Sequence, residues 1–199
     1  MATEDDTAQN LIKHLLDLHN NHDEKTNHEA RGKLANLRYA LRDRLHSDYP
    51  DWRVIPALEE GCLPDDPDRY LWYTLIAALF GLAHDEVTNR KNVSLGSAFR
   101  DLYEDRRTES TERRFMALLS SDAEHLPGHL RHAISLMKTP KDKPIGLDWK
   151  MLLYDVCHWN HSEKQVQKRW IRDYYRTRRS AGEQPTPDLS DAPTAVQGE

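Results

Sequence analysis

The feature that most constrains the fold is an uninterrupted apolar run, LWYTLIAALFGLA, at residues 71–83. Its 13 residues fall short of the ~20 that a membrane-spanning helix needs. A helix that is apolar on every side is normally buried by other elements. The run therefore predicts a buried central helix, residues 68–84, in a cytoplasmic protein that has no membrane partner.

The rest of the chain repeats apolar residues at intervals of three and four, as Leu34, Leu37 and Leu41 do, which is typical of amphipathic helices. No segment shows sustained alternation or an Asn-Gly or Asp-Gly hairpin. Capping boxes are expected at Thr26 and Ser162. The predicted class is all-α with no sheet. The other expected helices cover about residues 7–20, 26–46, 94–102, 110–119, 127–137, 149–159 and 162–178, with at most one short helix at 52–59.

The charge of the chain is unevenly distributed along its 199 residues, although the formal net charge is only −5. Residues 1–10 hold three acids and residues 180–199 hold four, with no Lys or Arg in either segment. Without these ends the body carries a charge of about +2. Residues 179–199 are predicted to form a disordered acidic tail. The two cysteines, Cys62 and Cys157, lack CxxC spacing and are expected to be reduced core thiols.

Arginines are concentrated in the segment at 92–121, which we interpret as a helix, a basic hinge and a second helix. Five lie within fifteen positions: Arg100, Arg106, Arg107, Arg113 and Arg114. On a helical wheel of about 100° per residue, Arg113 lies nearly opposite the apolar stripe of the second helix, and Arg114 lies on its flank. Interleaved acids leave open the alternative of a solvated, internally paired face.

Two further basic faces lie on the second and the last of the expected helices. Arg38 and Arg42, four residues apart on the second helix, repel each other unless an anion or an acidic side chain lies across them. Residues 164–179 hold seven basic residues and one acid, so internal pairing fails there. An anionic partner is expected for this face, and nucleic acid is the commonest such partner. Its members are Lys164, Lys168, Arg169, Arg172, Arg176 and Arg179, with Tyr175 among them.

Eleven histidines raise the question of metal or catalytic chemistry. His125, His129 and His132 are spaced four and three apart, but no carboxylate in that helix completes a site. The dipeptide His84-Asp85 resembles that of helical metal-dependent phosphohydrolases. The further ligands which that chemistry needs have only loose candidates: His14, His19, His22, Asp65 and Asp155. No HExxH, P-loop or GxSxG motif is present. We expect no catalysis, no cofactor and no metal.

Several segments, taken in order, resemble one family, the CasB family, which is the small subunit of the type I-E CRISPR effector complex Cascade. The similarity covers about residues 10–177. The segments that carry it are GKLANLRYA at 32–40, IPAL at 55–58 after Trp52, VSLGSAF at 93–99, ERRFMALL at 112–119, HLR at 129–131 with Leu136, and LDWKMLLYDVCHW at 147–159 with a later Trp170.

The resemblance implies a non-catalytic, all-helical protein made of two small bundles joined in the middle of the chain, at 7–90 and 91–178. It implies two copies in a head-to-tail dimer along the belly of Cascade, beside the backbone subunits and with contacts to the large subunit. The implied nucleic-acid partners are the guide RNA and the displaced single-stranded DNA of the R-loop, which the protein would stabilise in CRISPR antiviral defence.

The family motifs assign nucleic-acid contacts to Arg38, to Arg113 and Arg114 of ERRF, and to Arg131 of HLR. At Tyr39, where relatives can show a second arginine, the chain departs from the pattern. Together with the basic faces, the resemblance gives an expected binding set: Arg38, Arg42, Arg100, Arg113, Arg114, Arg131, Lys164, Lys168, Arg169 and Arg172. The alternatives are a helical metal-dependent phosphohydrolase and a basic-faced protein-interaction module that binds no nucleic acid.

Overall fold

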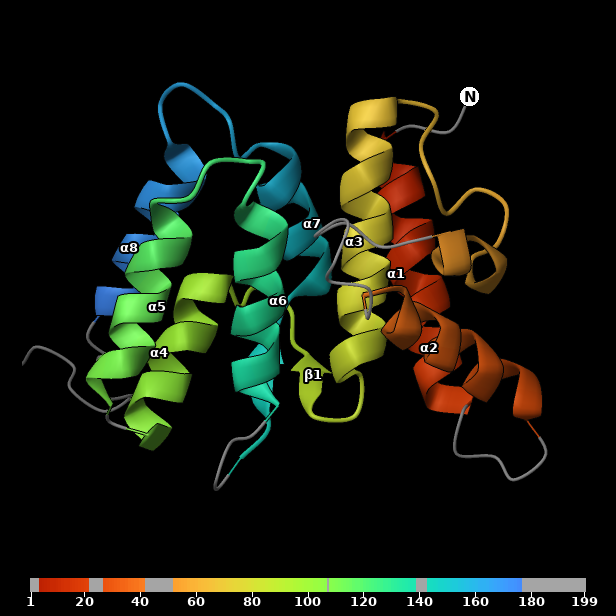
Figure 1. Ribbon diagram of the computed structural model, residues 1–199, viewed down its shortest axis with the longest axis horizontal. Coiled ribbons are helices and arrows are strands. Elements are labelled where there is room, and N and C mark those ends of the chain that lie inside the picture. The colour runs from red at the N-terminus through yellow and green to blue at the C-terminus, as the bar shows by residue number, and fades with distance from the viewer. Residues whose placement is uncertain (1–3, 22–26, 42–51, 107, 139–142, 177–199) are drawn as a thin grey trace, which may run out of the picture.

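The computed structural model describes residues 4–21, 27–41, 52–106, 108–138 and 143–176, and within these the chain is mainly helical. This confirms the all-α class (Figure 1). In chain order, the elements are α1 (Glu4–Asn21), α2 (His28–Ala40), the 3-10 helix η1 (Trp52–Ala57), α3 (Pro67–Ala83), β1 (Val87–Asn89), α4 (Leu95–Arg106), α5 (Glu109–Leu119), α6 (Leu126–Met137), β2 (Ile145–Leu147), α7 (Trp149–Cys157) and α8 (Gln165–Tyr175).

The apolar run forms the central helix α3, as the sequence predicts. Asp66 caps it by accepting hydrogen bonds from the backbone N–H groups of Asp68, at 2.9 Å, and Arg69, at 3.4 Å. Pro67 occupies the first turn, where its missing N–H is not needed. Helices α1 and α2 pack on one side of α3, and α6 and α7 on the other (Figure 1). Because α3 is covered from both sides, ten of its residues are buried, most of them apolar.

A small parallel sheet corrects the expectation of no sheet. Strands β1 and β2 pair with Val87 opposite Ile145 and Asn89 opposite Leu147. The pairing continues beyond the strands, where Arg90 N–H donates to the Leu147 carbonyl at 3.0 Å. Each strand has only three residues, too few to show an alternating pattern. The pair forms because the segments after α3 and before α7 are brought together by the packing of those helices.

Two glycines permit the closest helix contacts. At Gly81 of α3, a Cβ atom would collide with the Leu37 side chain of α2, and 3.0 Å would separate it from the Arg38 nitrogen. At Gly96 of α4, a Cβ atom would collide with the Trp170 carbonyl of α8 and lie 2.8 Å from its Cα. Glycine lets two backbones approach where any other residue would hold them apart. The SLG segment of the sequence thus marks the contact between α4 and α8.

The helix caps agree with the sequence only in part. Ser94 caps α4, because its Oγ accepts from the Ser97 N–H at 3.2 Å. The prediction of a capping box at Ser162 is wrong. Helix α8 begins after Lys164, which has a left-handed backbone (φ 50°) and makes no side-chain cap. Asn27 caps α2 by accepting from the Ala30 N–H at 3.1 Å. Thr26, the extension of α2 to residue 46 and the tail at 179–199 lie outside the described residues.

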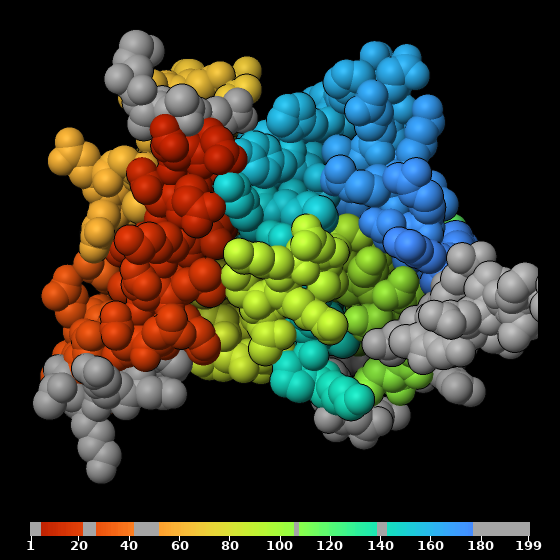
Figure 2. Space-filling view, turned by 180° about the vertical axis from the view of Figure 1, so that it is seen from behind, coloured from red at the N-terminus to blue at the C-terminus, as the bar shows by residue number. Residues whose placement is uncertain are grey.

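The buried residues of both halves of the chain belong to one continuous core. Helices α1 and α7, from opposite ends of the chain, lie side by side on the face shown in Figure 2. These contacts cross the expected boundary near residue 90. The division into bundles at 7–90 and 91–178 stays a prediction. None of the helices in the described ranges is long and apolar enough to cross a membrane.

The close approach of α4 and α8 gives a stability prediction. Gly96→Ala is expected to lower the free energy of unfolding by about 3 kcal/mol or more, because the added methyl group meets backbone rather than a mobile side chain. Gly32→Ala is the control, since nothing lies within 4 Å of a Cβ atom there, and it should stabilise α2 by up to ~1 kcal/mol. Urea unfolding followed by circular dichroism measures both. Equal stability of the two variants would contradict the packing described here.

Candidate nucleic-acid interface

Helix α5 presents Arg113 and Arg114 to solvent, as the wheel predicts. Phe115 and Leu118 of the same helix are buried, with exposed fractions of 0% and 1%. Neither arginine side chain makes a hydrogen bond or ion pair with the part of the chain that the structure describes. Desolvating a guanidinium is costly unless it finds an anion. These two cations are therefore free to bind an external anion.

Helix α8 carries a second row of free cations. Lys168 and Arg172 lie four residues apart on the same side of the helix, and Lys164 and Arg176 flank its two ends. All four are exposed, and their side chains have no hydrogen-bonding or ion-pairing partner within the described ranges. We call this row the α8 stripe: Lys164, Lys168, Arg172 and Arg176. The one acid of the segment, Asp173, forms no ion pair with the stripe in the described residues, and its carboxylate accepts a hydrogen bond from Ser94 Oγ at 2.6 Å.

The two surfaces meet at the end of α8. Tyr175, 54% exposed, donates a hydrogen bond to the Glu112 carboxylate of α5 at 2.6 Å. This bond to an anion raises the pKa of Tyr175. Beside it, burial, assisted by the Glu112 charge, raises the pKa of Tyr174 to about 12. The Tyr174 ring stacks on Phe115 at 4.6 Å. These contacts hold α5 against the last turn of α8, and both tyrosines are neutral at physiological pH.

Arg169 does not belong to the α8 stripe. Its guanidinium pairs with Asp155 of α7, whose side chain is only 4% exposed, while Trp170 Nε1 donates to the other carboxylate oxygen at 2.6 Å. Burial raises the pKa of Asp155, and the Arg169 charge acts in the opposite direction. The sequence pattern does not predict this pair, although an acid on the inward-facing side of a helix, as Asp155 is on α7, is a sign of a buried partner.

Arg100 is also engaged within the protein. One terminal nitrogen donates to the Asp173 carbonyl of α8 at 3.0 Å, and the other donates to Asp101 at 3.2 Å. The side chain therefore joins α4 to the end of α8. Arg131, half-buried on α6, likewise has an interaction within the protein. For both residues a nucleic-acid contact stays a prediction.

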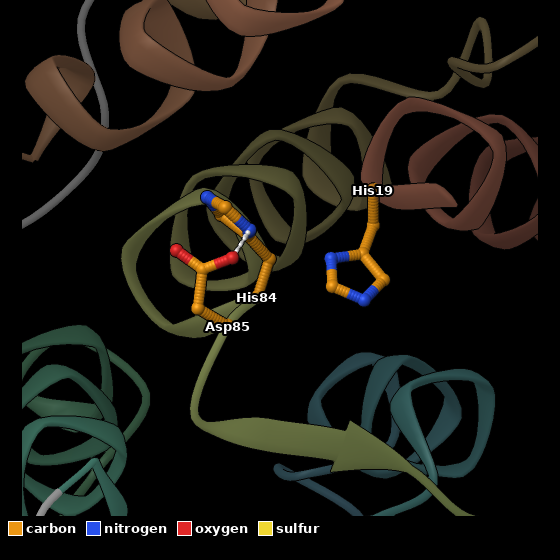
Figure 3. Close-up of side chains that lie close together, drawn as sticks. All are labelled: His19, His84 and Asp85. Atoms are coloured by element: carbon orange, nitrogen blue, oxygen red, sulfur yellow. Dashed lines mark ion pairs between the residues drawn. The ribbon is translucent and has the colours of Figure 1, made fainter. Parts of the chain in front are cut away.

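Arg38 lies in the other half of the chain, at the end of α3. Its Nε donates to the Gly81 carbonyl at 3.4 Å, and a terminal nitrogen lies 3.2 Å from His84 Nε2. A guanidinium only donates, so His84 Nε2 is the acceptor and the ring proton is placed on Nδ1. That atom lies 2.7 Å from Asp85 Oδ1 (Figure 3). Arg38 thus neutralises carbonyl charge at the end of α3. Arg42 lies outside the described residues.

Figure 3 shows His19, from α1, beside the His84-Asp85 pair, with the two rings 5.7 Å apart. Ligand atoms of the three residues lie within 4.8 Å of one another, and in the described part of the chain no other group meets this criterion. The ligand atoms of His125, His129 and His132 do not meet it. Two imidazoles and a carboxylate suit a single zinc-type ion. The Arg38 guanidinium on His84 adds a positive charge that opposes a bound cation.

The remaining candidates for a phosphohydrolase site do not join this cluster. His14 is bound to the Ala57 carbonyl at 2.9 Å, with Glu59 3.4 Å away. Asp155 is occupied by Arg169 and Trp170. Asp65 does not belong to the group, and His22 lies outside the described residues. The geometry therefore gives the cluster fewer ligands than a multinuclear hydrolase needs.

The contrast between Arg169 and the α8 stripe gives a prediction. Arg169→Ala leaves a buried carboxylate without its cation and is expected to cost about 3 kcal/mol of stability at neutral pH, near the lower end for a broken buried pair because Arg169 is partly exposed. The loss should shrink as the pH falls through the raised pKa of Asp155, since the protonated carboxyl carries no charge.

The matched control is Lys168→Ala, one residue away and exposed, which should leave stability within about 0.5 kcal/mol of wild type. Adding Asp155→Asn to Arg169→Ala should restore most of the lost stability, because the buried charge is then absent. Chemical denaturation across a pH series measures all three variants. If Arg169→Ala were as stable as Lys168→Ala, the assignment of Arg169 to the fold would be wrong.

Comparison with known proteins places this fold and these segments in one family. The model of the family described as CRISPR-associated protein Cse2 matches residues 33–175. The CRISPR-associated protein Cse2 of Thermus thermophilus is 32% identical over 131 residues, which span 64% of this chain and 69% of the relative.

Solved structures agree with this relationship. The crystal structure of M. ruber CasB superimposes with a TM-score of 0.64 at 27% identity, covering 85% of this chain and 92% of that one. A Cse2-family protein from T. thermophilus gives a TM-score of 0.62 at 25% identity, with coverages of 82% and 96%. A chain of a CRISPR RNA-guided surveillance complex shares the fold, with a TM-score of 0.59 at 18% identity and coverages of 84% and 90%. The chain therefore belongs to the Cse2 or CasB family, the small subunit of type I-E Cascade in CRISPR defence.

Proposed function

We propose that this Cascade subunit binds nucleic acid without reading its sequence and thereby stabilises the R-loop. The observation that carries the proposal is the set of exposed cations without protein partners in the described residues, Arg113 and Arg114 on α5 and the α8 stripe. A strand displaced by guide pairing has an arbitrary sequence, so phosphate contacts suit it better than contacts to base edges. R-loop formation is a nearly balanced exchange, and a few such contacts can shift it.

The partners we propose are the guide RNA, the displaced DNA strand, the backbone and large subunits of Cascade, and a second copy of this chain. A related fold is found in a CRISPR RNA-guided surveillance complex. Exposed apolar side chains, which often mark protein contacts, lie on η1 and α3, and also on α5 and α8, at Met116 and Ile171. They include Trp52, Ile55 and Leu71, at 71%, 41% and 42% exposed. We propose the exposed apolar side chains of η1 and α3 as contacts for other Cascade subunits.

The role is one of binding and needs no reaction, so we propose no catalytic residue and no cofactor. Of the two alternatives, the phosphohydrolase is disfavoured by the small number of ligands around His84 and by the guanidinium of Arg38. A protein-interaction module that binds acidic proteins uses the same free cations. Nucleic-acid binding by the purified chain at low salt distinguishes it from the role proposed here.

The proposal predicts that Arg113→Ala with Arg114→Ala weakens binding to a labelled, mixed-sequence single strand. Fluorescence anisotropy over a salt series should show a salt slope reduced by about 1.4 if each arginine contacts one phosphate of a single strand. The fold should be unaffected, because both side chains are exposed and make no contact that the core depends on. The same double variant should weaken target binding by assembled Cascade.

The matched control removes two exposed cations from the other half of the chain, Lys13→Ala with Arg53→Ala, and should leave the slope unchanged. An unchanged slope in the α5 double variant would remove Arg113 and Arg114 from the interface. Absence of binding by wild type even at low salt would favour the protein-interaction alternative.

A further inference from the structure

A hollow of about 440 Å³ lies between α5 and α6, beside the free arginines of α5. The two helices run next to each other (Figure 1). The apolar side chains that line the hollow include Phe99 of α4, Ala117 of α5 and Leu136 of α6. Phe99 is only 1% exposed, so it forms the deep end, and its ring packs 4.9 Å from that of Phe115. A hollow of this size and lining is within the range of small-ligand sites.

The rim of the hollow is polar and cationic. Arg114, His129 and His132 line it, and they come from the ERRF and HLR segments and the residue that follows. The Arg114 side chain is exposed and makes no hydrogen bond or ion pair with the described residues. The imidazoles offer groups that can donate or accept a hydrogen bond. An apolar interior behind a positive rim fits a ligand that has a flat apolar part joined to an anion.

We propose that the hollow binds one unstacked base of a single strand, while Arg114 contacts the phosphate of the same nucleotide. This inference rests on the proposed function and adds a base contact to it. Bases of single strands are free to leave the stack and to bind aromatic and apolar side chains, and such contacts tolerate any sequence. The site therefore adds affinity and fixes the register of the strand without making the binding sequence-specific.

Charge decides between a nucleotide and an apolar protein segment. Arg113, one residue away on α5, is also exposed and free of partners in the described chain. A strand whose base enters the hollow has phosphates on both sides of that nucleotide, and both are attracted to a surface with two free guanidiniums. An uncharged peptide segment would use the apolar interior but would leave these cations unmatched. The rim thus favours the nucleotide.

The test compares two single strands of equal length and phosphate number, one with mixed bases and one in which abasic sites replace the central bases. Fluorescence anisotropy of the full chain should show the abasic strand bound about tenfold more weakly, the scale of one lost base contact. Ala117→Trp places an indole in the hollow and should reduce binding of the mixed strand to the level of the abasic strand. Binding of the abasic strand should hardly change.

Asn20→Trp, at an exposed position on α1, is the control for adding an indole and should behave as wild type. Ala117→Leu is a second, smaller filling substitution in case the Trp variant misfolds, and circular dichroism monitors the fold. Equal binding of both strands by wild type, with no effect of filling the hollow, would overturn the base site and leave phosphate binding intact. Loss of Cascade assembly in Ala117→Trp, with unchanged strand binding, would assign the hollow to a protein segment. Failure of wild type to bind either strand at low salt would overturn the proposed function itself.

Discussion

The burial of α3 is the constraint on which the rest of the structure depends. A helix with ten buried residues cannot lie on a surface, so other helices have to cover it from several directions. On one side Gly81 lets α2 approach until the Leu37 side chain meets its backbone. On the other side α6 and α7 pack against it. Because these two groups share α3, the two halves of the chain have one core.

The same packing determines which cations remain available. Arg169 pairs with Asp155, and Arg100 donates to the carbonyl of Asp173, because a polar group near the core needs a hydrogen-bonding partner. The α8 stripe lies on the outer side of the same helix, where water solvates it. One helix therefore both holds the fold together and offers a surface to an anion. The four cations of the stripe have no side-chain acceptor among the described residues.

Helix packing also places the family motifs. The SLG segment provides the glycine at which α4 meets α8, so its role is structural. The ERRF segment divides its residues between the core, through Phe115, and solvent, through Arg113 and Arg114. Next to it, the HLR segment contributes His129 to the rim of the hollow and Leu130 to the core. Each segment is thus constrained both by packing and by the surface it presents.

The sequence by itself determined the helices, the central position of α3 and the exposure of Arg113 and Arg114, because the 3.6-residue period is a local property of the chain. Only the tertiary structure decided which basic residues are free. Arg169 and Arg100 find partners 14 and 73 residues away, and β1 pairs with a strand beyond α6. Such contacts leave no periodic trace in either segment. They depend on the distances between packed helices, which no local pattern specifies.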